Sequence, residues 1–97
     1  MMAWFSVARS DLRFTTDMPA AYQSSGHATR RFCAHCGTQL TFESDEQPTE
    51  IDITTASLDD PEQVPPADHV HDGRRLSWLR LADDLPRYPD ARPGSQA

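Results

Sequence analysis

The sequence contains no lysine, so all nine of its basic residues are arginine, a bias that indicates a GC-rich bacterial genome. It has no apolar run approaching the roughly 18 residues that a membrane-spanning helix needs. Its first residues, MMAWF, lack the cationic start and the apolar centre of a secretory signal peptide. These absences exclude a membrane-spanning helix and, with only two cysteines present, predict a protein of the reducing cytoplasm.

A surplus of positive charge is missing as well. Nine arginines stand against 15 acidic residues, which gives a net charge of -6. Nucleic-acid binding requires a basic surface that displaces the counterions of the phosphate backbone. The two arginine pairs, at 30–31 and 74–75, are expected to pair with nearby carboxylates. The sequence therefore predicts neither a nucleic-acid partner nor a membrane partner.

Apolar residues are scarce for a folded domain. They make up 37% of the 97 residues, and the chain has eight prolines; globular chains usually have roughly 45–50% apolar residues. A chain of this length forms one domain with a small core. Such domains often need a metal ion, a crosslink or a partner subunit to become stable.

Helical periodicity is hard to find, and strand signals dominate. β-branched and aromatic residues between turn residues predict short strands over residues 4–8, 12–16, 20–24 and 28–32. Apolar and polar residues alternate at 40–43 and at 50–54, which predicts a β-hairpin. Residues 57–62 are typical of a capped helical turn, and residues 68–71 of a last strand. We therefore expect a mainly β fold of antiparallel strands with short helical turns.

The two cysteines stand close together, at Cys33 and Cys36 in the run CAHCG. This motif places two thiolates on one tight turn, and Gly37 permits the positive φ that the turn needs. Zinc takes four ligands in a tetrahedron, so the motif supplies half of a site. A redox dithiol is disfavoured because a strand, not a helix, follows the motif, and a pair of unligated thiols is the remaining alternative. The pattern favours structural zinc, with Cys33 and Cys36 as metal ligands.

Histidines are the other candidate ligands. His35 lies between the cysteines, and His27 precedes Cys33 by six residues. His69 and His71 are two residues apart, so on a strand both side chains would point to the same face. Imidazole is a good zinc ligand, but a histidine of a small domain is more often an ordinary surface residue. The sequence leaves the choice open.

The order of motifs along the chain carries a resemblance to a known family. The runs WFSV at 4–7, RFCAHCGTQL at 31–40, SLDDP at 57–61 and DLPRY at 84–88 follow one another. In this the chain resembles the glutathione-dependent formaldehyde-activating enzyme family, which also includes centromere protein V. The resemblance implies a β-tent fold of packed antiparallel sheets, with a domain over residues 1–89 and a flexible tail over residues 90–97.

The resemblance also implies ligands and an activity. The family holds a structural zinc with a Cys-x-Cys pair near the N-terminus and a Cys-x-x-Cys pair near the middle, and Cys33 and Cys36 match the second pair. Members join formaldehyde to glutathione, formally a carbon–sulfur lyase reaction in reverse. All the N-terminal cysteines of the family are absent, so we expect a chain that is N-terminally truncated relative to it. No catalytic and no cofactor-binding residue carries over.

Three functions are open at this point. In the first, the chain is a zinc-binding member without the family's activity, and a second protomer in a homodimer, or His69 and His71, completes the zinc tetrahedron. Alternatively, it is an active enzyme whose site is rebuilt around these histidines and the cysteines, with glutathione or another small thiol as substrate. The third alternative is a non-catalytic module whose sheet is completed by another chain.

Overall fold

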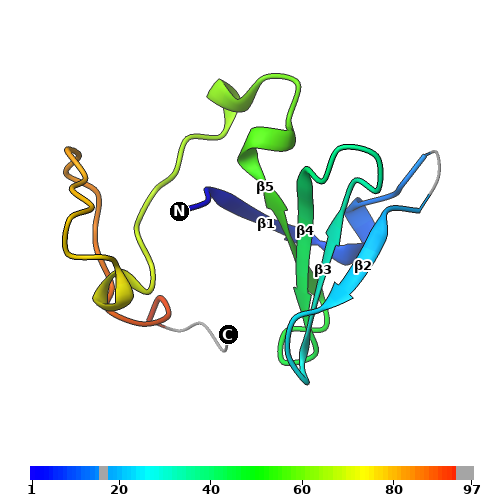
Figure 1. The fold of residues 1–97 in the computed structure, drawn as a ribbon, viewed down its shortest axis with the longest axis horizontal. Coiled ribbons are helices and arrows are strands. Elements are labelled where there is room, and N and C mark those ends of the chain that lie inside the picture. Colours follow the sequence, from blue (N-terminus) through cyan, green and yellow to red (C-terminus); the bar gives the residue numbers. More distant parts are fainter. Residues whose placement is uncertain (16–17, 94–97) are drawn as a thin grey trace. The chain divides into compact units, whose positions relative to one another are not determined.

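The computed structural model describes residues 1–15 and 18–93. The chain divides into two compact units, Met1–Pro65 and Pro66–Ala97, which we call the sheet unit and the C-terminal unit. All five strands of the described residues belong to the sheet unit (Figure 1). Within the described ranges the helical segments are short 3-10 turns, and none has the length or apolar character that crossing a membrane requires.

The sheet unit is built on one antiparallel sheet. Its order is β1-β5-β4-β3-β2, with β1 and β2 at the two edges (Figure 1). The expectation of a mainly β fold with antiparallel strands is confirmed. The described residues form one sheet, however, and not the several packed sheets that the resemblance implied. The strands are β1 (Trp4–Ala8), β2 (Ala20–Gln23), β3 (Ala28–Phe32), β4 (Gln39–Ser44) and β5 (Glu50–Thr54).

The predicted hairpin is confirmed as β4 and β5. Phe42 pairs with Asp52 and Thr41 with Ile53. The turn between the strands is closed at its base, where the Ser44 hydroxyl accepts a hydrogen bond from the Glu46 N–H at 3.2 Å. This register places Phe42 and Asp52 on one face of the sheet and Thr41 and Ile53 on the other, so the apolar residues of the two strands lie on opposite faces.

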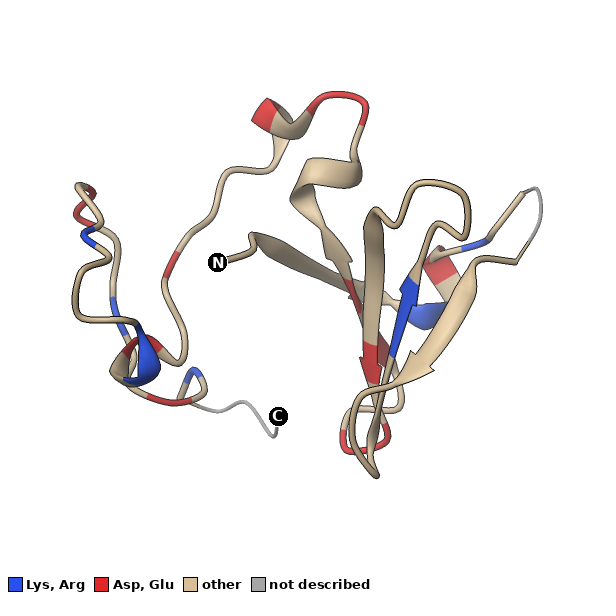
Figure 2. Ribbon diagram, viewed as in Figure 1, with Lys and Arg blue, Asp and Glu red and all other residues tan. Residues whose placement is uncertain are grey.

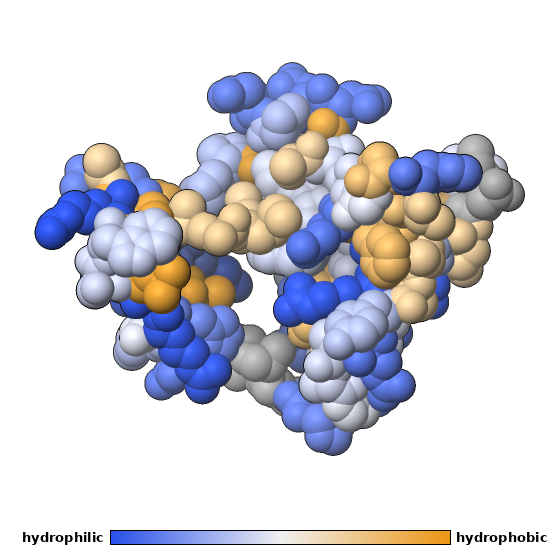
Figure 3. Space-filling model, in the orientation of Figure 1, coloured by the Kyte–Doolittle hydropathy of each residue, from blue (hydrophilic) through white to orange (hydrophobic). Residues whose placement is uncertain are grey.

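The core of the sheet unit is small and partly polar. Ala28 and Ile51 are its buried apolar residues among those described, and Thr54 is its most deeply buried side chain, at 1% exposure. The Thr54 hydroxyl donates a 2.7 Å hydrogen bond to the Gln39 carbonyl, whereas the buried Thr41 hydroxyl has no partner in the described structure. Apolar residues also remain at the surface (Figure 3). The sheet therefore depends more on backbone pairing than on a large apolar core.

The expected strand over residues 12–16 is wrong for residues 12–15; Thr16 lies outside the described residues. A 3-10 turn, η1 (Arg9–Asp11), follows β1, and residues 12–15 belong to no strand. The sheet order explains the difference, since this segment leaves β1 at one edge and leads to β2 at the other. A segment that crosses a sheet cannot pair within it. The Arg9 side chain holds the start of this segment against the sheet, because it donates hydrogen bonds to the carbonyl oxygens of Glu50 and Ser44.

The capped helical turn expected over residues 57–62 is confirmed in its second half, where the 3-10 turn η3 (Pro61–Gln63) forms; another 3-10 turn, η2 (Thr55–Ser57), follows β5 directly. Asp60 caps η3, because its carboxylate accepts a hydrogen bond from the Glu62 N–H at 3.2 Å. Pro61 occupies an early helical position, where its missing N–H costs no hydrogen bond.

The C-terminal unit contains one more turn, η4 (Asp72–Arg74), and an isolated parallel bridge between His69 and Arg87. The bridge is formed by the His69 N–H with the Pro86 carbonyl and by the Tyr88 N–H with the His69 carbonyl, both at 2.8 Å. The expected strand over residues 68–71 is therefore wrong, because only one residue of it pairs. The pairing partner lies 18 residues further along, outside the reach of a local pattern.

Candidate metal centre

The two cysteines lie on the connection between β3 and β4. The Cys33 N–H donates to the Thr38 carbonyl at 2.9 Å, and the Gly37 N–H donates to the Cys33 carbonyl at 2.8 Å. Gly37 has φ +79°, a conformation that glycine adopts without steric cost. The strand register shifts just before this turn, between Arg31 and Phe32. The local sequence therefore folds into the tight turn that the motif predicts, with both thiols on it.

The environment of the thiols favours ligand chemistry at Cys36. Both cysteines are free, with Cys33 half-buried and Cys36 exposed. The Thr38 hydroxyl lies 3.1 Å from the Cys36 sulfur. This hydrogen bond, then the backbone of Thr38 and the Cys33 thiol, lower the pKa of Cys36 below its ordinary value. A lower pKa raises the fraction of thiolate, the form that binds metals.

The described residues do not complete the site. They contain no group of three or more His, Cys, Asp or Glu side chains that could hold a metal ion. His27 precedes β3 and Cys33 follows it, so the five residues of the strand hold them about 20 Å apart along extended chain. His27 and Cys33 of one chain therefore cannot share an ion. Two thiols on a turn fit half of a zinc tetrahedron. Within one chain, the described residues bring no third or fourth ligand to them.

His69 and His71 do not form the pair that the sequence suggested. His71 has φ 53° and precedes η4, while His69 lies in the bridge with Arg87. Since residues 68–71 are not a strand, the reason for expecting both side chains on one face does not apply. The Nε2 atom of His69 is also engaged, at 2.9 and 3.1 Å from the two carboxylate oxygens of Asp83.

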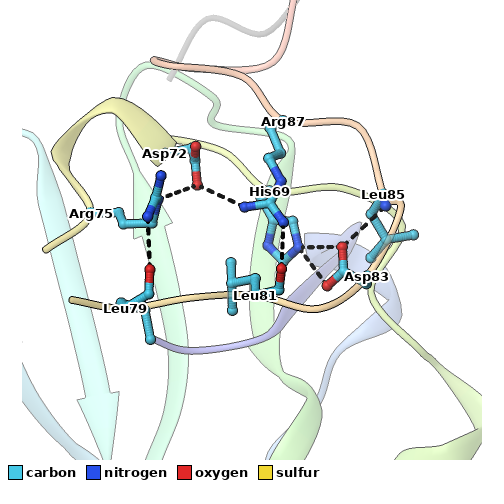
Figure 4. A network of polar contacts seen from close by, with 8 residues as sticks. All are labelled: His69, Asp72, Arg75, Leu79, Leu81, Asp83, Leu85 and Arg87. Atoms are coloured by element: carbon cyan, nitrogen blue, oxygen red, sulfur yellow. Dashed lines mark hydrogen bonds and ion pairs between the residues drawn. The ribbon is translucent and has the colours of Figure 1, made fainter. Parts of the chain in front are cut away.

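This histidine belongs to a polar network within the C-terminal unit. The hydrogen bond from His69 lowers the pKa of Asp83, and the N–H of Leu85 adds to that effect. Asp72 lies 3.3 Å from the Arg75 guanidinium and 3.7 Å from that of Arg87. The Arg75 guanidinium also donates to the Leu79 carbonyl, and the Arg87 guanidinium to the Leu81 carbonyl (Figure 4). The side chains of the network therefore hold the backbone of this unit in place.

Two cavities border the cysteine turn, and sequence reasoning missed both. One, of about 500 Å³, has Cys33 and His35 in its wall together with Arg13, Phe14 and residues around them. The other, of about 470 Å³, lies over β2 and β3 and reaches Gly37. The first is formed by residues 13–15, which the sequence placed in a strand. No local signal could have located it, because the cavity depends on the crossing of that segment.

Comparison with known proteins gives one match. The family described as glutathione-dependent formaldehyde-activating enzyme matches residues 1–74. No curated protein and no solved structure matches the chain. The matched range covers the whole sheet unit, including both cysteines and the turn that carries them.

Proposed function

The chain belongs to the glutathione-dependent formaldehyde-activating enzyme family, and from this premise we propose that it binds zinc through Cys33 and Cys36. The observation that carries the proposal is the turn between β3 and β4, where a positive-φ glycine and two backbone hydrogen bonds hold both cysteines. The lowered pKa of Cys36 supports it. Four-coordinate zinc supplies folding free energy that a small core lacks. Ligation needs reduced thiols, which agrees with a cytoplasmic location.

We propose that a second copy of the chain closes the site. A two-fold axis beside the cysteine turn would bring Cys33 and Cys36 of each protomer together as four thiolates. This arrangement would supply the ligands that the described residues of one chain do not bring together. The β-tent arrangement of the family remains our proposal for the complete fold.

Metal analysis combined with a mass measurement in solution tests this proposal. We expect one zinc per two chains, a dimer that a chelator dissociates, and loss of both in the Cys33→Ser/Cys36→Ser variant. His35→Ala is the matched control from the same turn and should keep metal and dimer. One zinc per chain in a monomer would instead indicate ligands from the same chain, and absence of zinc would contradict the proposal.

A second candidate function is chemistry on a small thiol such as glutathione. The family description names glutathione and formaldehyde, and the Cys33 cavity supports the idea because Cys33, Arg13 and His35 all line a volume of about 500 Å³. Cavities of this size suit small molecules. Turnover of glutathione with formaldehyde, lost in Arg13→Gln and in Cys33→Ser, would support it. No turnover by the zinc-loaded protein would leave the non-catalytic module, with an open sheet edge for a partner chain, as the alternative.

A further inference from the structure

The second cavity beside the cysteine turn has no role in the zinc site, and its charge is unusual for this chain. Its volume is about 470 Å³, and Tyr22, Arg30, Phe32 and Gln39 contribute to its wall. Arg31 also lines it but is paired with Glu43 at 3.4 Å, and no aspartate or glutamate of the described residues is in the wall. In a chain with a net charge of -6, this is a local positive site. Such a site attracts anions.

The position of Arg30 follows from the strand register. Arg30 pairs with Tyr22 of β2 on one side and with Phe42 of β4 on the other. Directly paired residues of antiparallel strands share a face, so the three side chains form a row across the sheet. The Arg30 guanidinium carbon lies 4.8 Å from the centre of the Phe42 ring and 6.0 Å from that of Trp4. Two rings therefore orient the guanidinium.

Arg30 has no ion-pair partner within 4.0 Å among the described residues. Arg31 of β3 and Arg9 of η1 differ in this respect, because they lie 3.4 and 3.0 Å from the carboxylate of Glu43. Figure 2 shows the basic stretch of β3 in blue, in a sheet whose other strands carry acidic positions in red. Among the described residues no carboxylate forms an ion pair with Arg30. Aromatic rings contact the face of a guanidinium and leave the N–H groups at its edge free to donate.

We propose that this cavity binds a small organic carboxylate with an apolar body. The guanidinium of Arg30 would donate to the carboxylate, the geometry for which arginine is suited. Phe32, Tyr22 and Ala21 would contact the apolar body. The largely carbon-lined wall favours an organic acid over inorganic phosphate. This proposal does not depend on the proposed zinc site, so either can be correct without the other.

Benzoate, with its uncharged isostere benzamide, is a suitable pair of probes. Binding is followed by NMR of the full chain through the indole N–H of Trp4, which lies next to Arg30. Trp78, in the C-terminal unit, serves as an internal reference, and the Trp78→Phe variant assigns the two signals. We expect saturable shifts of the Trp4 signal with benzoate, little change with benzamide or inorganic phosphate, and no change at Trp78.

Variants separate this site from general charge attraction. Arg30→Gln should weaken benzoate binding about tenfold or more, since it removes a charged donor, and Arg30→Lys should restore it only in part. Gln39→Glu places a carboxylate in the cavity through an exposed side chain and should weaken binding by a similar factor even if Arg30→Gln does not fold. Arg13→Gln, an exposed arginine outside this cavity, should change the affinity less than twofold.

Three results would overturn the proposal. They are equal binding of benzamide and benzoate, unchanged affinity in both Arg30→Gln and Gln39→Glu, and a Trp4 signal that does not respond to benzoate. None of them bears on zinc, which Cys33 and Cys36 would hold in each of these variants.

Discussion

The two units of the chain are stabilised by different kinds of interaction. The sheet unit has four antiparallel strand pairings, and the ion pairs of its described residues converge on one acidic side chain, Glu43. The described part of the C-terminal unit has one backbone bridge and several charged contacts. These join Asp68 with Arg92, His69 with Asp83, and Asp72 with Arg75 and Arg87.

This difference determines what each unit responds to. Backbone ladders and buried side chains depend little on pH and salt, whereas exposed ion pairs weaken when a partner is neutralised or when salt screens them. We therefore expect the sheet unit to fail when its few buried positions change, and the C-terminal unit to fail when its charges change.

The largest effect is expected from Ile51→Ala in β5. Ile51 is 6% exposed and is one of two buried apolar residues among those described. Truncation of a buried aliphatic side chain costs about 2–5 kcal/mol of unfolding free energy, a large part of the stability of a small domain. Urea unfolding followed by Trp4 fluorescence should show the loss.

Val70→Ala is the matched control for that variant. Val70 is 43% exposed and lies in the C-terminal unit, so the same unfolding curve should move by less than about 0.5 kcal/mol. Equal losses in the two variants would show that the sheet unit does not have a separate core.

A smaller effect of opposite sign is expected from Thr41→Val in β4. The Thr41 side chain is 2% exposed, and its hydroxyl is buried without a hydrogen-bond partner. Such a group keeps a desolvation cost of about 1 kcal/mol or more. Removing it in an isosteric valine should raise the unfolding free energy by about 1 kcal/mol. A decrease on replacement would mean that the hydroxyl is satisfied in solution.

Acid should loosen the C-terminal unit before the sheet unit. Hydrogen bonds from Arg92 and His69 lower the pKa values of Asp68 and Asp83 in the folded state. A carboxyl group with a lowered pKa stabilises the fold fully above its unfolded pKa, about 3.9, and loses that contribution as the pH falls below it. The amide of Tyr88 should therefore exchange faster below about pH 4, while the amides of β4 remain protected.

Asp68→Asn and Asp83→Asn serve as controls for the acid effect. Each removes one of the titrating groups, so the exchange of the Tyr88 amide should become less dependent on pH. Simultaneous loss of protection in β4 and at Tyr88 would contradict the contrast between the units.

The smallest effect is expected from Thr38→Val at the cysteine turn. The hydroxyl of Thr38 is the largest cause of the lowered pKa of Cys36. Its removal should raise that pKa toward the ordinary value without changing the fold. The pH dependence of iodoacetamide alkylation measures the change, with Cys33→Ser present so that a single thiol reacts. An unchanged profile would mean that the Thr38 backbone alone sets the pKa.

Local patterns predicted the parts of this fold that local chemistry determines. The alternation around Phe42 and Ile51 predicted the hairpin, and the spacing of Cys33 and Cys36 with Gly37 predicted their turn. The failures are non-local. The segment at 12–15 reads as a strand but crosses from one sheet edge to the other, and His69 pairs with a residue that no neighbouring pattern indicates. Zinc ligation by the two cysteines stays a prediction.

The hydroxyl of Thr54 links the end of β5 to the first residue of β4, immediately after the cysteine turn. If Cys33 and Cys36 hold zinc as proposed, opening of the turn that carries them would strain the bond between Thr54 and Gln39. We therefore expect the residence time of zinc to depend on how often β5 opens. Loss of the hydroxyl would then speed exchange of the proposed ion more than it lowers equilibrium affinity, which would give the sheet a kinetic role in retaining it.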